Sequence, residues 1–514
     1  MHRSNMITLG VSLALATGAA QAGSYTGPQS SATPYVVPTA DGWEVTSLIT
    51  VGDTAKNSPY AMVGIPDGMG AVAGKFAENG AYVADKAYMT VFLNHELGGS
   101  AGVVRAHGST GAFVSQWTIH LNSLQVKWGE DLIRDVYVWD GSGFAQAPGV
   151  TFNRFCSGDL PPLTGFYDPA SGKGFNGLIY MNGEETGAEG RAFGHVVSGD
   201  EKGTSYELPY LGKFSWENSV AHPNAGDKTL VVGLDDSSPG QVYLYVGDKQ
   251  SSGNPVERAG LQNGYLYGIK VTDGGSNYGN GPAPSENAGA IEGSFELHPF
   301  TRAEAAGSGA ALQALSVAAG VTEFARPEDG HWDTRNPNVF YWATTGRSGQ
   351  TARLYKFTFD SIENPTGGTI ELVVDSASLT GEDGETARSF DNLTVDGDGN
   401  VIVQEDPGGS AYIAKTWKIN PTTGSAVQIF ESDRDRFDPA GPDFLTTNEE
   451  SSGVIEVTDI VQNANWYEAG RRYYLANMQA HYPIAGELVE GGQVYLMASP
   501  NISAATGKGK KNGK

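Results

Sequence analysis

Short runs of β-branched and aromatic residues, separated by Gly, Asp and Asn, recur along almost the whole chain. Runs of this length and composition predict β-strands joined by tight turns. Glycine supplies 70 of the 514 residues, about twice its average share, which suits many turns and few long helices. The clearest helical pattern is the Ala-rich segment 302–319. We therefore expect an all-β fold with inserted loops and a few short helices.

Two segments show a strand-turn-strand unit most clearly. Residues 392–403 contain a strand, an Asp-Gly turn and a second strand, and residues 234–245 have the same layout around an acidic turn. Units of this kind, at about 50–70 residues each, suit a β-propeller of five to seven blades. An irregular pair of β-sandwiches is the architectural alternative. The Gly/Ser-rich segment 273–289 is expected to be an insertion loop.

The N-terminal residues have the layout of a Sec-type signal peptide. A basic start containing Arg3 leads into the apolar run 7–20, which ends at the small-x-small sequence Ala20-Gln21-Ala22. The apolar run is too short to remain as a membrane-spanning helix. We expect a cleaved signal peptide over residues 1–22, one propeller domain over 23–500 and a disordered basic tail over 501–514. The mature protein is expected in the periplasm or outside the cell.

The chain is strongly acidic, with a net charge of -25. This charge argues against nucleic acid as a partner, because a phosphate backbone requires a basic surface. The acidic residues either keep the surface soluble or converge on hard cations. We expect a monomer with no stable membrane anchor.

Acidic side chains gather at the ends of predicted strands, beside Gly, Ser or Pro. The segments concerned are Asn94-His95-Glu96, Asn182-Gly183-Glu184-Glu185, Trp216-Glu217, Asp235-Asp236, Arg326-Pro327-Glu328-Asp329 and Asp391-Asn392. In a propeller the inner strands and the loops of one face converge on a central channel, so these carboxylates would meet there. Their mutual repulsion is costly unless cations are bound, and Ca²⁺ takes six to eight such oxygen ligands.

Each of these residues also has a simpler explanation when taken singly. Asp235 and Asp236 could cap a turn, and the Glu184-Glu185 pair could be surface charge. His95 could form hydrogen bonds in the core. Cys156 is the single cysteine, so it cannot form an internal disulfide, and it is either a small buried apolar residue or a metal ligand.

The order of these segments resembles that of the PhoX-type bacterial alkaline phosphatases. Asn94-His95-Glu96, the Cys156-Ser157-Gly158 segment and Glu184-Glu185 follow one another as in that family. Arg326-Pro327-Glu328-Asp329 closely resembles the family's Arg-Pro-Glu-Asp segment. Later segments also fit: Tyr341 to Thr345, Asp391 to Leu393, Glu450 to Val457 and Gln479 to Tyr482. The similarity extends over nearly the whole mature chain.

This resemblance implies a six-bladed propeller that holds iron and calcium ions on its axis. It implies that Cys156 and Glu217 bind iron, with Glu328 beside them, and that Arg326 clamps the phosphate, so that Arg326 and Glu328 are the catalytic residues. The further ligands that it implies are Glu184, Glu185, Asp235, Asp236 and Asp391, with Asn94 and Glu96 in the same shell. The chain departs from the family in lacking a twin-arginine signal and in the long spacing from Cys156 to Glu184.

We therefore expect an exported metal-dependent phosphatase that acts on small phosphorylated organic substrates, with calcium and iron as cofactors. The chain has no P-loop. One alternative is a calcium-only propeller hydrolase that acts on phytate, phosphodiesters or lactones. The other is a non-catalytic, secreted, calcium-stabilised propeller that binds a partner.

Overall fold

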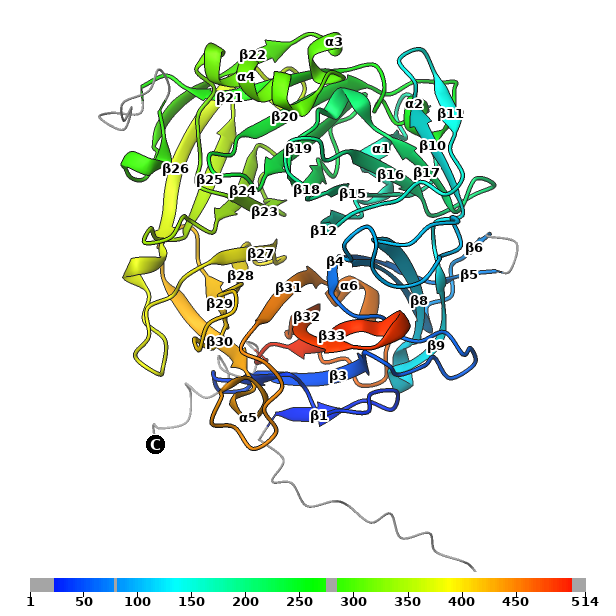
Figure 1. The fold of residues 1–514 in the computed structure, drawn as a ribbon, viewed down its shortest axis with the longest axis vertical. Helices are drawn as coiled ribbons and strands as arrows, with labels where there is room; N and C mark the ends of the chain where they lie inside the picture. Colours follow the sequence, from blue (N-terminus) through cyan, green and yellow to red (C-terminus); the bar gives the residue numbers. More distant parts are fainter. Residues whose placement is uncertain (1–22, 78–80, 274–283, 502–514) are drawn as a thin grey trace, which may run out of the picture.

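In the computed structural model, β-sheets stand around a common axis like the blades of a propeller (Figure 1). The structure describes residues 23–77, 81–273 and 284–501. The expected signal peptide (1–22), residues 502–514 of the expected tail and the middle of the 273–289 loop lie outside these ranges. Within them, no helix is long and apolar enough to cross a membrane.

The innermost strand of each blade lines the axis. These six strands are β4 (Pro66–Ala73), β12 (Phe155–Asp159), β18 (Trp216–Ala221), β23 (Pro327–Trp332), β27 (Phe390–Val395) and β31 (Glu449–Glu456). Each contacts the next one around the ring, and β31 contacts β4. The closed ring confirms the expected six-bladed propeller and excludes the pair of β-sandwiches.

Each blade continues outward through hydrogen-bonded strands. Blade 1 adds β7 (Tyr88–His95), β8 (Phe113–His120) and β9 (Gln125–Asp131). Blade 2 adds β15 (Ile179–Glu184), β16 (Ala192–Val196), β17 (Thr204–Glu207), β10 (Asp135–Trp139) and β11 (Phe144–Gln146). Blade 3 adds β19 (Lys228–Asp235), β20 (Val242–Asp248), β21 (Tyr265–Val271) and β22 (Gly293–Phe300).

The other three blades follow the same plan. Blade 4 adds β24 (Val339–Thr344), β25 (Arg353–Phe359) and β26 (Gly367–Asp375). Blade 5 adds β28 (Val401–Glu405), β29 (Lys415–Ile419), β30 (Ala426–Ser432) and β2 (Val36–Pro38). Blade 6 adds β32 (Tyr473–Ile484), β33 (Val489–Ala498), β3 (Glu44–Thr50) and β1 (Ser24–Thr26). Two further hairpins pair β5 (Lys75–Phe76) with β6 (Tyr82–Val83) and β13 (Tyr167–Asp168) with β14 (Lys173–Gly174).

The two ends of the chain meet in blade 6. Strand β3, near the N-terminus, pairs antiparallel with β33, near the C-terminus, and so supplies the fourth strand of this blade. Blades 3 and 4 are joined at their outer edges, where β22 pairs with β26. The ring is therefore held closed by backbone hydrogen bonds between distant parts of the sequence.

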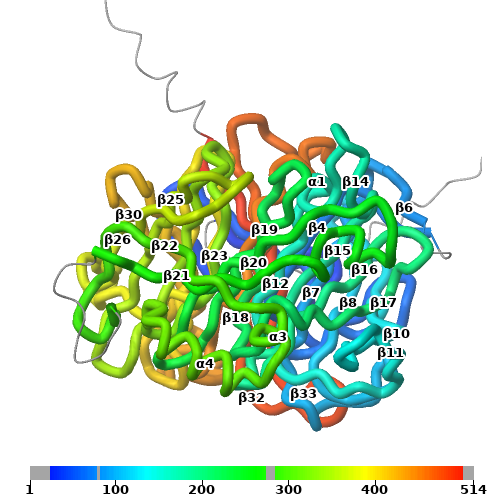
Figure 2. The backbone as a smooth tube through the Cα atoms, turned by 90° about the horizontal axis from the view of Figure 1, so that it is seen from above, coloured from blue at the N-terminus to red at the C-terminus, as the bar shows by residue number. Residues whose placement is uncertain are grey.

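Helices are short and lie between strands. They are α1 (Leu163–Phe166), α2 (Pro255–Arg258), α3 (Arg302–Ala305), α4 (Gly309–Ala319), α5 (Arg434–Phe437) and α6 (Thr458–Val461). The single helix expected over 302–319 is interrupted, because Ser308 caps a new helix by accepting a hydrogen bond from the Ala311 amide. Helix α3 packs against β21 in blade 3 (Figure 2).

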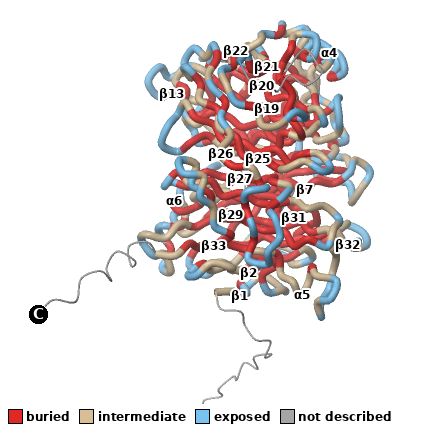
Figure 3. The backbone as a smooth tube through the Cα atoms, turned by 90° about the vertical axis from the view of Figure 1, so that its left-hand side faces the viewer, coloured by how far each residue is buried: buried red, intermediate tan, exposed pale blue. Residues whose placement is uncertain are grey.

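The core lies between neighbouring blades, so most strands are buried on both faces (Figure 3). In β28, Val401 and Val403 belong to one buried apolar cluster and Ile402 to another. Successive side chains of a strand point to opposite faces, and here each face packs on a different set of residues. The 392–403 and 234–245 segments form the predicted hairpins β27–β28 and β19–β20.

Candidate metal centre

Each of the six inner strands contains a β-bulge close to its first residue. A bulge inserts one extra residue and redirects the side chains beside it. The second residue of each strand lies at or beside this bulge, and we call these six residues the inner ring. They are Asp67, Cys156, Glu217, Glu328, Asp391 and Glu450. Six strands that start at the same end of the axis thus supply five carboxylates and one thiol.

A second set of polar side chains comes from the strand next to each inner strand. The first residue of each inner strand pairs with a residue of the neighbouring strand, such as Pro66 with His95 and Trp216 with Asp235. The residues immediately beyond these partners form the outer ring. They are Glu96, Glu185, Asp236, Thr345, Asp406 and His481.

The two rings bring possible metal ligands close together. Three groups have ligand atoms that all lie within 4.8 Å of one another. They are Asp67 with Glu96 and Cys156, Cys156 with Glu185 and Glu217, and Glu217 with Asp236 and Glu328. Because Cys156 and Glu217 each belong to two groups, the three groups form one continuous cluster across blades 1 to 4.

The carboxylates of this cluster are buried beside one another. Burial, followed by the charges of Asp67, Glu185 and Asp236, raises the pKa of Glu217 well above its ordinary value. Burial and the charge of Asp236 do the same to the pKa of Glu328. Such a cluster must either hold protons or bind cations, because like charges at close range repel one another.

Asp391 provides a test of whether cations fit the site. Its side chain is buried, and its Oδ1 atom has no hydrogen-bond partner among the described residues. Burial, followed by the charges of Glu328 and Glu217, raises its pKa well above the ordinary value. A buried carboxylate oxygen without a donor requires a proton or a cation. The donor set therefore fits bound metal.

Cys156 is buried among acidic groups. Its thiol lies 3.5 Å from Asp67 Oδ2, although the two residues are 89 positions apart in the sequence. Burial, followed by the charges of Asp67 and Glu217, raises the pKa of the Cys156 thiol well above its ordinary value. A thiol in this setting becomes a thiolate only when a cation is bound to it.

Two arginines lie beside the cluster, at equivalent positions in blades 2 and 4. Arg154 and Arg326 each stand two residues before an inner-ring residue, with backbone φ angles of 49° and 62°. Arg326 donates to both carboxylate oxygens of Asp236, at 2.8 and 2.9 Å, and lies 3.3 Å from Glu328. Arg154 lies 2.6 Å from Glu96 and also pairs with Glu185. Both guanidinium groups remain partly open to solvent, with 48% and 35% of the side chain exposed.

Blade 6 contributes a histidine instead of an acidic outer-ring residue. His481 Nδ1 lies 2.6 Å from Glu490, and its Nε2 lies 3.8 Å from Glu450. Although burial acts against it, the two carboxylates raise the pKa of His481 to about 10. This side of the ring therefore carries its own positive charge.

Four of the residues expected as ligands lie outside the three ligand groups: Glu184, Asp235, Asn94 and the inner-ring residue Asp391. Both oxygens of Glu184 are held by Arg191, at 2.7 and 2.8 Å. Asp235 accepts a hydrogen bond from the Ser215 amide and belongs to none of the three ligand groups. The reason is strand alternation: Glu184 and Asp235 point to one side of their strands, and the residues that follow them point to the axis.

Asn94, which was also expected among the ligands, holds the bulge of β12. Its Nδ2 donates to the carbonyl oxygens of Cys156 and Ser157, at 2.7 and 3.2 Å. Its Oδ1 accepts a hydrogen bond from Asn182. The amide therefore holds the bulge of β12 in place.

The sequence analysis missed Asp67 in the cluster and Arg154 beside it, and assigned no role to Glu450 or His481. A signal for Asp67 does exist. Pro66-Asp67-Gly68 has the same order of residue types as Pro327-Glu328-Asp329-Gly330, and both begin an inner strand. Comparing the segment around Asp67 with the segment around Glu328 would have revealed Asp67 as a candidate ligand.

Comparisons with known proteins agree with this architecture. The family model described as alkaline phosphatase PhoX matches residues 171–436. The structure of Pseudomonas fluorescens PhoX in complex with vanadate, a transition state analogue, is similar with a TM-score of 0.54 and 13% identity, covering 90% of this chain and 97% of that one. A protein of unknown function from Dyadobacter fermentans gives a TM-score of 0.42 and 9% identity, covering 89% and 99%. No curated protein sequence matches the chain.

Proposed function

The chain belongs to the alkaline phosphatase PhoX family and is therefore a metal-dependent phosphatase, and from this premise we propose that it is exported and hydrolyses phosphate monoesters at the two rings. The observation that carries the proposal is the buried cluster of carboxylates and one thiol at one end of the propeller axis. A phosphate monoester repels nucleophiles through its own charge, so a site that neutralises this charge accelerates its hydrolysis. Small phosphorylated organic molecules are the proposed substrates.

The residues of the rings differ in the metals that they suit. The group of Glu217, Asp236 and Glu328 offers oxygen alone, which favours calcium. The groups that include Cys156 offer a soft thiolate as well, which favours a transition metal such as iron. When bound, these cations would act as Lewis acids and offset the charge of the phosphoryl oxygens.

Arg326 is the proposed phosphate clamp. Asp236 holds its Nε and Nη2 atoms, which fixes the plane of the guanidinium group. Its Nη1 atom has no hydrogen-bond partner among the described residues and can donate to a phosphoryl oxygen. A planar, fixed donor of this kind stabilises the charge that spreads over the oxygens in the transition state.

The test is the hydrolysis of p-nitrophenyl phosphate by wild type and Arg326→Lys. We expect the substitution to lower kcat/KM by about 100-fold, the scale for losing one oriented donor, while the fold is unchanged. Arg302→Lys, at the outer edge of blade 3, is the control and should keep wild-type activity. Activity that survives exhaustive EDTA treatment, or that Arg326→Lys leaves intact, would contradict the proposal.

The role of Cys156 is tested by elemental analysis of protein purified from its native compartment. We expect wild type to contain iron and calcium, and Cys156→Ser to lose iron while it keeps calcium. The calcium content is the internal control for folding. Equal iron in both proteins would show that the thiol is not a ligand.

A further inference from the structure

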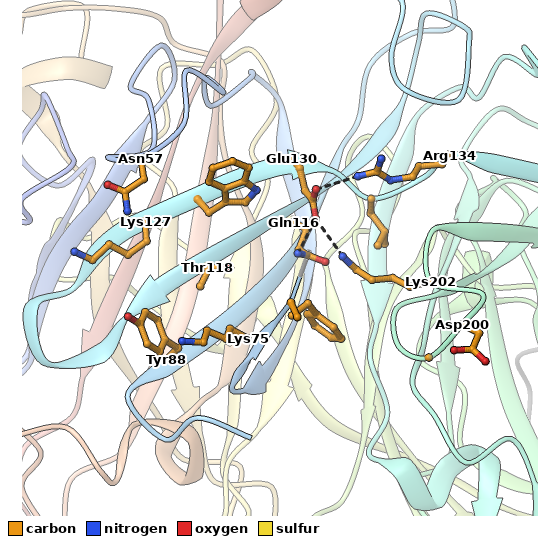
Figure 4. Close-up of a pocket in the computed structure, with 15 residues that line it drawn as sticks. Asn57, Lys75, Tyr88, Gln116, Thr118, Lys127, Glu130, Arg134, Asp200 and Lys202 are labelled. Atoms are coloured by element: carbon orange, nitrogen blue, oxygen red, sulfur yellow. Dashed lines mark hydrogen bonds and ion pairs between the residues drawn. The ribbon is translucent and has the colours of Figure 1, made fainter. Parts of the chain in front are cut away.

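A cavity of about 700 Å³ lies on the outer part of blade 1, where it faces blade 2, away from the metal centre (Figure 4). Its wall is formed by β7, β8 and β9, and Lys202 reaches it from the turn between β16 and β17. The volume is in the range of sites that bind small molecules.

The pairing of β8 with β9 brings polar and aromatic side chains to one face. Gln116 pairs with Glu130, and Thr118 pairs with Trp128. A register shift follows Thr118, and Lys127 is the extra residue on β9. This bulge lets both Lys127 and Trp128 line the cavity, although neighbouring strand residues ordinarily point to opposite faces.

The cavity contains one basic side chain without an ion pair to any described residue, that of Lys127, because Lys75 pairs with Asp85 at 3.0 Å and the other two basic residues pair with Glu130. Four basic side chains and two acidic ones line it: Lys75, Lys127, Arg134 and Lys202, with Glu130 and Asp200. Glu130 pairs with Arg134 at 3.0 Å and with Lys202 at 3.1 Å. Lys127 forms no ion pair with any described residue and contacts only an amide oxygen, that of Gln125, within hydrogen-bond distance. A negatively charged ligand would supply the ion-pair partner that Lys127 lacks.

Two further features indicate what else the ligand carries. Gln116 is 3% exposed, and its Nε2 atom donates to Glu130, yet its Oε1 atom has no hydrogen-bond partner. A buried acceptor of this kind requires a donor such as a hydroxyl group. Trp128, in contrast, is 47% exposed, which is unusual for so large an apolar ring. Its face is available for stacking with a ring-shaped ligand.

We propose that this cavity binds an anionic saccharide, of the class of uronic acid oligomers. The sugar carboxylate would pair with Lys127, a ring face would stack on Trp128, and a hydroxyl would donate to Gln116 Oε1. Inorganic phosphate has no ring face to stack on Trp128, whereas a sugar has one, and Glu130 and Asp200 can both accept hydrogen bonds from sugar hydroxyl groups. The proposal does not depend on the phosphatase activity.

The experiment measures binding of trigalacturonate to the full-length mature protein by calorimetry. We expect binding that weakens with added salt, and no binding of the neutral trisaccharide maltotriose. Trp128→Ala and Lys127→Gln should each weaken binding at least about tenfold, which corresponds to loss of one good contact. Tyr25→Ala and Lys228→Gln are the controls, because they remove an exposed aromatic residue and a partly exposed lysine elsewhere on the protein. Hydrolysis of p-nitrophenyl phosphate should be the same in all four variants.

Three results would overturn the proposal. They are no detectable binding of trigalacturonate, unchanged binding in Trp128→Ala, and binding of inorganic phosphate as tight as that of trigalacturonate. The last result would identify a simple anion site. Gln116→Leu keeps the approximate size of the side chain and removes the acceptor Oε1. If a sugar hydroxyl donates to this atom, we expect the substitution to weaken trigalacturonate binding although the packing is retained.

Discussion

At the scale of single residues, the centre depends on which of two adjacent side chains faces the axis. Glu185 and Asp236 lie in the cluster, whereas Glu184 and Asp235 lie on the other side of their strands. The segment Arg326-Pro327-Glu328 is informative in sequence because it closely resembles a segment of the family. The acidic pairs are ambiguous, since their orientation depends on strand register.

Arg154 should stabilise the metal-free protein. Its partner Glu96 is buried and its partner Glu185 is partly buried, and Arg154 is the positively charged group that directly contacts both of them. In EDTA, we expect Arg154→Gln to lower the free energy of unfolding by about 1–2 kcal/mol, less than for a fully buried pair because Arg154 is partly exposed. Added calcium should restore part of the loss. Urea unfolding measures the effect.

Arg134→Gln is the control for this prediction, because it removes an exposed arginine that pairs with Glu130. We expect a change within about 0.5 kcal/mol. If Arg154→Gln behaves like this control in EDTA, the two carboxylates do not depend on Arg154.

At the scale of secondary structure elements, the repeated bulge determines the site. It occurs near the start of all six inner strands, and the acidic or thiol residue lies beside it each time. Near one of these bulges, two neighbouring inner strands, β4 and β12, also lie very close to each other. At Gly68, an added Cβ would lie 2.0 Å from the amide nitrogen of Gly158 and 2.4 Å from the carbonyl carbon of Ser157.

Gly68→Ala should therefore force β4 away from β12. The contacts are with backbone atoms, which cannot rotate aside, so we expect a loss of about 3 kcal/mol in the free energy of unfolding. Gly143→Ala is the matched control, because nothing lies within 4 Å of its Cβ position. It should change stability by less than about 0.5 kcal/mol. Equal midpoints for both variants in urea would show that the inner strands are not tightly packed.

At the scale of the whole molecule, many acidic side chains are buried in the interior of the propeller. Burial raises the pKa of Asp159 and of Glu405 to about 7, and it also raises the pKa values of the inner-ring carboxylates Glu217, Glu328 and Asp391. In the folded protein these groups keep protons at pH values where the unfolded chain, with carboxyl pKa values of about 4, has lost them. The stability that they contribute is therefore complete below pH 4 and is lost as the pH rises through about 7.

The metal-free protein should consequently melt at a lower temperature at pH 8 than at pH 5. Calcium should raise the melting temperature more at pH 8, because protons no longer compete with it for the carboxylates. Calorimetry in EDTA and in calcium at both pH values measures this, with sodium chloride of equal ionic strength as the control. A melting temperature that rises from pH 5 to pH 8 in EDTA would contradict the prediction.

The sequence by itself determined the strands, the hairpins around residues 392–403 and 234–245, and the presence of acidic segments at strand ends. These features depend on local propensity and on turn chemistry, which are readable from neighbouring residues. The order of these segments along the chain, with Arg326-Pro327-Glu328-Asp329 among the most specific, resembled the family closely enough to predict a six-bladed phosphatase.

Only the tertiary structure decided which acidic residues meet. Asp67 contacts Cys156 although 89 positions separate them, and Glu185 instead of Glu184 faces the axis. Both facts depend on closure of the ring and on one-residue bulges, and a shift of one residue turns a strand's side chains to the other face. The local sequence does not indicate where such a shift occurs. The strand register, and with it the set of residues that face the axis, therefore follows only from the tertiary structure.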